Sequence, residues 1–146
     1  MDALALVEFL AIVLTALALV PAAAHVMELP AKLPMTREAY LIVQRLYRGW
    51  NLSGIVVIAA LAATFALLLS VDGEAFVPAL IGFLAIVATQ IVFWVFTFPV
   101  NRITHNWTRA PDDWKQLRDR WELSHAASAV LNFIAVVCVT VAVLRA

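Results

Sequence analysis

Ionisable side chains occur as pairs at the ends of two apolar stretches of the chain. His25 and Glu28 are three residues apart near the end of the first stretch, and Glu122 and His125 are three apart at the start of the last. Residues three apart lie on one face of a helix, so each pair presents a carboxylate and an imidazole together. Ionisable groups in membrane segments usually face the protein interior, because turning a charge to lipid costs about 2–3 kcal/mol or more. The two pairs are therefore candidate catalytic or ligand-binding groups.

Further polar side chains are expected at the same depth as these pairs. Asn101 and His105 follow the third apolar stretch, and Asn51 begins the second. All four stretches then contribute polar groups at one level. We therefore predict that the two His/Glu pairs converge between the helices, close enough to share a ligand or a hydrogen bond.

The two pairs fit several kinds of site. A Glu-x-x-His pair supplies ligands in di-metal carboxylate bundles, but the two further glutamates of such sites are missing here. A single iron, copper or zinc ion held by His25, Glu28, Glu122 and His125 is chemically reasonable, and so is a haem ligated by two of the three histidines. A pocket that binds substrate without a metal, and a purely structural network with neighbouring basic residues, are open as well.

The composition places these residues in a membrane protein. Of 146 residues, 64% are hydrophobic and 14% are charged, against roughly 45–50% and about 25% in soluble domains. Four stretches have the approximately 20 residues that a helix needs to cross the hydrocarbon core. They are residues 4–24, 52–71, 76–100 and 126–144, and Gln90 is the only strongly polar group we expect near the midplane. We predict one all-α domain over residues 1–146, a bundle of four transmembrane helices.

The basic residues predict the orientation of this bundle. Nine of the ten lie in the two long connections. In the first they are Lys32, Arg37, Arg45 and Arg48, and in the second Arg102, Arg109, Lys115, Arg118 and Arg120. By the positive-inside rule both connections are cytoplasmic and both termini periplasmic. With no net charge and no nucleic-acid-reading motif, the expected partner is the lipid bilayer rather than nucleic acid.

The two halves of the chain share a pattern. Pro30 and Pro34 are expected to interrupt the first connection, and each connection ends in an amphipathic cytoplasmic extension that precedes the second or the fourth helix. Trp50-Asn51-Leu52-Ser53 then opens the second helix, and Trp121-Glu122-Leu123-Ser124 opens the fourth. This pattern indicates two parallel tandem hairpins related by an axis along the membrane normal.

Four short motifs resemble those of a known family. They are His25-x-x-Glu28-Leu29-Pro30-x-Lys32, Tyr40-x-x-x-Gln44, Tyr47-Arg48-Gly49-Trp50 and Arg120-Trp121-Glu122-x-x-His125-Ala126. Over nearly the whole chain they resemble small bacterial four-helix membrane proteins akin to the anthrone oxygenases. Many relatives carry an arginine three positions after the last histidine, where this chain has Ser128. The resemblance implies a bacterial inner-membrane protein, and fungal relatives are associated with oxidising anthrone-type polyketides to anthraquinones without a recognised cofactor.

We interpret the chain as an oxygenase-like oxidoreductase or a protein that binds a small apolar aromatic molecule. His25 or His125 would act as general base or ligand, with Glu122 and Glu28 orienting the imidazoles. Asn101 and His105 would hydrogen-bond the substrate, and Trp121 would form an apolar wall. The competing interpretation is a non-catalytic structural subunit or assembly factor, whose polar cluster docks partner subunits of a larger membrane complex.

Overall fold

Four helices are long and apolar enough to cross a membrane, as the sequence predicts. The computed structural model describes residues 2–146, and within that range it contains helices and no strand. The four spans are helix α1 (Ala3–Lys32), a span of Trp50–Ser70, a span of Gly73–Thr104 and helix α6 (Trp114–Arg145). The second consists of η2 (Trp50–Leu52) and α3 (Ser53–Ser70). The third joins α4 (Gly73–Val92), the π-helical segment η3 (Phe93–Thr97) and α5 (Phe98–Thr104).

Helix α1 continues through Pro30, which was expected to interrupt the first connection. Its first turn is capped by Asp2, whose side chain accepts from the Ala5 N–H at 2.8 Å, and it includes both Pro21 and Pro30. Proline removes one backbone donor, and membrane helices tolerate this loss. Pro30 therefore does not interrupt the first connection as expected, because α1 ends only at Lys32, before Pro34.

A short separate helix, α2 (Arg37–Gln44), follows α1. The Thr36 hydroxyl caps it by accepting from the Ala39 N–H at 3.3 Å. After the 3-10 turn η1 (Arg45–Tyr47), the chain turns at Gly49, whose φ of 90° lies in the left-handed region that glycine adopts without strain. Because of this turn, α2 is separated from α3, whereas α6 runs unbroken from Trp114.

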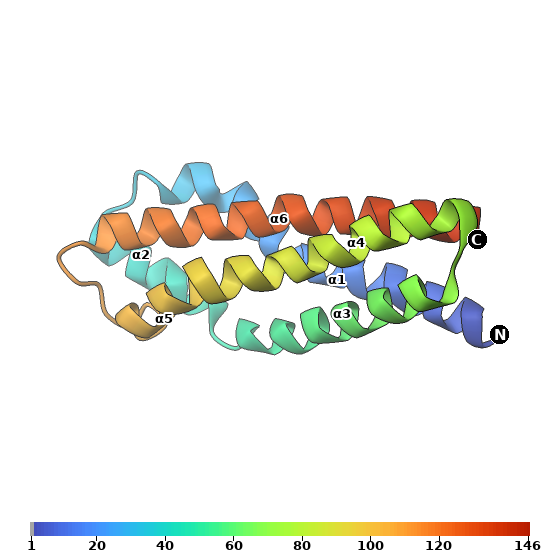
Figure 1. The fold of residues 1–146 in the computed structure, drawn as a ribbon. Coiled ribbons are helices and arrows are strands. Elements are labelled where there is room, and N and C mark those ends of the chain that lie inside the picture. The colour runs from blue at the N-terminus through green and yellow to red at the C-terminus, as the bar shows by residue number, and fades with distance from the viewer. Residues whose placement is uncertain (1) are drawn as a thin grey trace.

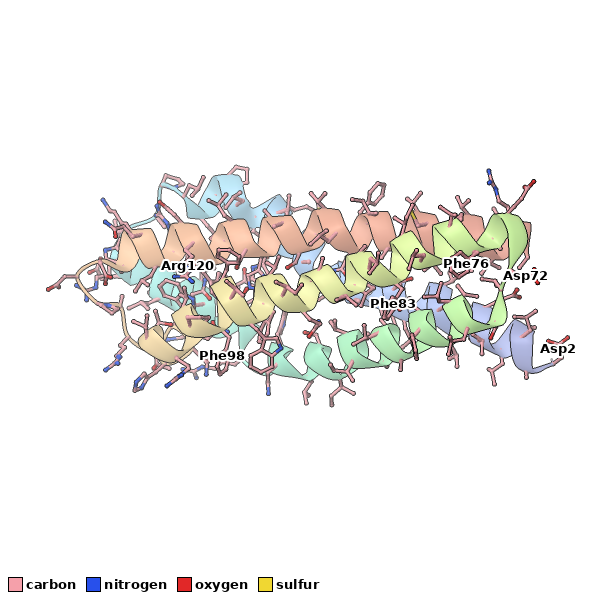
Figure 2. All side chains as sticks on the ribbon, viewed as in Figure 1. Asp2, Asp72, Phe76, Phe83, Phe98 and Arg120 are labelled. Carbon is pink, nitrogen blue, oxygen red and sulfur yellow. The ribbon has the colours of Figure 1, made fainter. Side chains whose placement is uncertain are left out.

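The long helices pack in the order α1, α3, α4, α6, with α6 also in contact with α1. Both termini lie at one end of the molecule, and α2 and α5 lie at the other (Figure 1). Asp2 and Asp72 mark the first of these ends, and Arg120 lies toward the second (Figure 2).

Small residues occupy the interior and large apolar residues the outside. Ala11, Ala79 and Ala142 are at most 1% exposed, whereas Phe133 is 59% exposed and Leu69 71%. Membrane helices pack in this way because small side chains let their backbones approach, and lipid solvates the large ones. The structure thus has the surface of a multi-pass membrane protein.

Candidate functional site

The ammonium group of Lys32 is the centre of a buried polar cluster. Its Nζ lies 3.0 Å from Nδ1 of His25, 2.9 Å from Oε2 of Glu28 and 3.4 Å from Oε1 of Glu122. An ammonium has three N–H donors and no acceptor, so these three partners use all of its donors. Nδ1 of His25 must then accept, which leaves the proton of a neutral His25 ring on Nε2. Lys32 itself is 1% exposed.

Glu122 reaches this cluster from α6. It is 2% exposed, and its Oε1 accepts from the Tyr40 hydroxyl at 2.9 Å as well as pairing with Lys32. Tyr40, on α2, is fully buried among aromatic side chains. Burial raises the pKa of Tyr40 well above its ordinary value, and the charge of Glu122 adds to the rise. Tyr40 is therefore held in its protonated form, as a hydrogen-bond donor to the carboxylate.

Glu28 forms the more exposed side of the cluster. Its carboxylate pairs with Lys32 and accepts from the Tyr47 hydroxyl, and its side chain is 41% exposed. Burial raises the pKa of Tyr47, and the hydrogen bond to Glu28 raises it further. One ammonium thus faces two carboxylates, and a tyrosine hydroxyl donates to each carboxylate.

The two imidazoles stack on each other. The rings of His25 and His125 have centroids 4.2 Å apart and are inclined by 25°. Trp121 packs edge-on against both rings, with centroid distances of 4.8 Å to His25 and 4.3 Å to His125. The structure therefore brings together both His/Glu pairs, and Trp121 forms an apolar side of the cluster.

Asn101 and His105 are not brought equally close to this cluster. Oδ1 of Asn101 accepts from the Trp121 indole N–H at 2.8 Å, so the amide holds the ring that borders both imidazoles. His105 is the left-handed C-cap of α5, with φ of 50°, and its side chain is exposed. His105 therefore lies away from the contacts around Lys32, although it and Asn101 both line one cavity of about 290 Å³.

Helix α6 is fixed against the π-helical segment beside the cluster. The Ser124 and Thr97 hydroxyls share a hydrogen bond of 2.8 Å, and Nη2 of Arg120 donates to the Val95 carbonyl at 2.6 Å. Arg120 extends from α6 in Figure 2. A π-helical turn breaks the regular pattern of backbone hydrogen bonds and is frequent at functional sites. These two contacts hold the turn of α6 that carries Trp121, Glu122 and His125.

The arrangement of the His and Glu side chains does not fit the metal site that the sequence left open. Within residues 2–146, no three His, Cys, Asp or Glu side chains are arranged to hold a metal ion. Lys32 lies between Glu28 and Glu122 and engages Nδ1 of His25, so a cation already satisfies these groups. A second cation at this point would be repelled by the ammonium.

Three further residues belong to the site although the sequence does not make them candidate site residues. Lys32 is expected only as one of the basic residues of a structural network, and Tyr40 and Tyr47 only as residues of the first connection and of the resemblance motifs. The signal for Lys32 was its spacing from His25 and Glu28, because residues seven and four apart share a helical face.

Asn132 is a second polar group in the apolar part of the chain, besides Gln90. It is 3% exposed on α6, and its Nδ2 donates to the Ser128 carbonyl at 2.9 Å. The expectation that Gln90 alone is strongly polar at this depth is therefore wrong. The asparagine was visible in the sequence, inside the stretch 126–144.

Comparison with protein-family models, with curated proteins and with solved structures found no match for this chain.

Proposed function

We propose that the chain is a membrane-embedded protein that binds a small apolar aromatic molecule at the Lys32 cluster and oxidises it in an oxygenase-like reaction. This proposal joins the geometry of the cluster to the resemblance of its motifs to the anthrone oxygenases. The four long helices would form a transmembrane bundle of two tandem hairpins in a bacterial inner membrane. The cluster would then lie at the cytoplasmic end, with both termini periplasmic.

One observation carries the binding proposal, namely a row of unpartnered polar atoms on α6. Oε2 of Glu122, Nε2 of His125 and Oδ1 of Asn132 are all buried and have no hydrogen-bond partner within residues 2–146. Their spacing of three and seven residues puts them on one helical face, over about 15 Å at 1.5 Å per residue. Buried polar groups are nearly always paired, so a row of three supports a ligand that meets this face.

The proposed chemistry begins with proton transfer. Nε2 of His125, which has no hydrogen-bond partner within residues 2–146, would take one proton from a CH₂ group between two aromatic rings. The three N–H donors of Lys32 are already used, so its ammonium would act on the developing negative charge of the substrate through its charge alone. The carbanion would then give electrons to dioxygen and form a C–O bond, and loss of water would leave a carbonyl. Overall, CH₂ and O₂ become C=O and H₂O.

In this proposal His125 is the base, and His25 and Glu122 have supporting roles. His25 stacks on His125 while its Nδ1 is held by Lys32, so it orients the second ring. Glu122 anchors Lys32 through Oε1 and keeps Oε2 free for a donor on the ligand. Glu28 and Asn101 hold Lys32 and Trp121 in place.

The test uses purified protein in detergent with anthrone and dissolved oxygen. We expect wild-type protein to bind anthrone, quench tryptophan fluorescence and form anthraquinone with one O₂ consumed per product. His125→Ala should abolish product formation while the protein stays folded, and Glu122→Gln should weaken binding. His105→Ala is the matched control, because that imidazole is exposed outside the cluster, and it should leave both measurements unchanged.

The opposite result would favour the structural-subunit interpretation. If anthrone and related tricyclic aromatics neither bind nor react, while both His125→Ala and Glu122→Gln lower the thermal unfolding midpoint, the cluster is a structural network. Co-purification of a stoichiometric membrane partner with wild-type protein, lost in these variants, would identify it as a docking surface.

A further inference from the structure

A polar cavity lies beside α2, apart from the Lys32 cluster. It has a volume of about 130 Å³ and lies between α2 with its 3-10 turn and the connection that follows α5. Its polar lining consists of Gln44, Arg45, Arg48, Asn106, Trp107 and Thr108. A cavity needs about 10–15 Å³ to admit one water, so this one admits a group of several heavy atoms.

Two of the residues that line this cavity each carry a buried N–H donor that lacks an acceptor. Nε2 of Gln44 and Nε1 of Trp107 have no hydrogen-bond partner within residues 2–146, and the two residues are only 6% and 4% exposed. An indole nitrogen can only donate, so Trp107 can be satisfied only by an acceptor. Burying a donor without an acceptor is unfavourable, which points to an acceptor brought by a ligand.

The charge of the lining has one sign. Arg45 and Arg48 contribute two exposed guanidinium groups, and no carboxylate lines the cavity. A guanidinium presents a planar fork of donors that matches the oxygens of phosphate. Two cations and two orphaned donors around a small cavity therefore match an oxyanion such as a phosphate group.

The backbone that carries the Trp107 indole is strained. His105, Asn106 and Trp107 have φ of 50°, 53° and 58°, and a left-handed conformation is unusual for a residue as bulky as tryptophan. Thr104 supports the turn, because its Oγ1 accepts from the Trp107 N–H at 3.1 Å. On its inner side the Trp107 ring packs edge-on against Tyr40 at 4.9 Å. The indole N–H is thus held in place by the surrounding fold.

We infer that this cavity is a phosphate-binding site, formed by Arg45, Arg48, Gln44 and Trp107. The cavity lies just beyond the ends of the second and third apolar spans, which begin at Trp50 and end at Thr104. That is the depth at which lipid phosphates would lie if these helices cross a bilayer, and basic pockets at this level bind anionic headgroups. The shared chemistry is a phosphate group, supplied either by an anionic phospholipid or by free phosphate. This inference does not depend on the reaction proposed for the Lys32 cluster.

The experiment measures the thermal unfolding midpoint of the purified protein in detergent as each probe is added. The probes are inorganic phosphate, short-chain phosphatidylglycerol, short-chain phosphatidylcholine and sodium chloride at matched ionic strength. A ligand that binds only the folded state raises the midpoint with its concentration. A rise with both phosphate and phosphatidylglycerol supports the site and shows that free phosphate suffices. A rise with phosphatidylglycerol alone supports a lipid-derived phosphate.

Three variants separate this site from general charge effects. The double variant Arg45→Gln/Arg48→Gln should raise the half-saturating concentration about tenfold or more, because charge-assisted hydrogen bonds are lost. Trp107→Phe keeps the ring against Tyr40 but removes the orphaned donor, so it should weaken binding without lowering the ligand-free midpoint. Arg37→Gln removes one charge from α2 outside the cavity and should behave as wild type. Equal responses in all variants, or no response of the wild type to phosphate and phosphatidylglycerol beyond chloride, would overturn the inference.

Discussion

The Nζ atom of Lys32 lies 3.0 Å from Nδ1 of His25, and the same ammonium is the only cation in contact with both Glu28 and Glu122 within residues 2–146. A lysine that is 1% exposed is stable only where its charge is compensated. The two carboxylates in turn need the ammonium. This mutual dependence makes Lys32 the residue on which the cluster rests.

We predict that Lys32→Met destabilises the protein by about 3–5 kcal/mol, the usual cost of leaving a buried ion without its partner. The thermal unfolding midpoint in detergent measures the change. Lys32→Met combined with Glu122→Gln should recover part of the loss, because the second change removes the uncompensated carboxylate. Lys115→Met is the matched control, since Lys115 is the other lysine of the chain and is exposed on α6. Equal effects of the two single lysine variants would contradict the central role of Lys32.

Tyr40 and Tyr47 determine how the stability of the protein should change above pH 10. Both donate to carboxylates of the cluster, and burial raises the pKa of Tyr40 and of Tyr47 above the ordinary value of 10.0. The folded state therefore binds these protons more tightly than the unfolded state. Their contribution to stability is complete below pH 10 and is lost as the pH rises above it, when the unfolded chain begins to release protons.

The tyrosinate absorbance band tests this directly, because the chain contains only two tyrosines. We expect no tyrosinate near pH 10 while the protein is folded, and a rise only when it unfolds. Tyr40→Phe should reduce the loss of stability above pH 10, since one of the two linked groups is gone. A tyrosine that titrates near pH 10 in the folded protein would contradict the prediction.

The topology is predicted from the positions of the basic residues. With both termini periplasmic, the turn between α3 and α4 is external and the connection between α5 and α6 is cytoplasmic. Asp72 and Asp112 are exposed at these two places, so Asp72→Cys and Asp112→Cys form a matched pair. In a Cys138→Ala background, a membrane-impermeant maleimide added to intact cells should label only the first. Labelling of Asp112→Cys alone would reverse the orientation.

How far the sequence predicts this structure depends on the range of the interaction concerned. The four apolar helices follow from hydropathy, which is a local property of each stretch. The approach of both His/Glu pairs to one another was also predicted, because the cost of a charge in lipid turns such groups inward. The contacts of Tyr40 with Glu122 depend on where α2 folds back, since 82 residues separate the two in the chain. No pattern of spacing encodes that contact.

The errors of prediction have local causes. Pro30 is expected to interrupt the first connection, but a membrane helix tolerates proline and α1 continues through it to Lys32. The exposure of the His105 imidazole depends on the left-handed turn that ends α5, which no spacing of residues predicts. Backbone turns of this kind depend on contacts such as the Thr104 hydroxyl with the Trp107 N–H, which a sequence of this composition does not reveal.

The packing of α4 against α6 gives the last prediction. Gly82 lies against Val139, and a Cβ added to Gly82 would be 2.9 Å from Cγ2 of Val139. Overpacking usually costs about 1–3 kcal/mol, whereas replacing a helical glycine by alanine gains up to about 1 kcal/mol. The valine side chain is stiff and the backbone of α6 is close behind it, at 3.4 Å from the added Cβ, so the clash should exceed the gain.

We therefore expect Gly82→Ala to lower the thermal unfolding midpoint, and Gly82→Ala with Val139→Ala to restore most of it. Gly54→Ala on α3 meets nothing within 4 Å and should leave the midpoint unchanged or raise it. If Gly82→Ala were as harmless as Gly54→Ala, the two helices would not be as closely packed at this point as the structure has them.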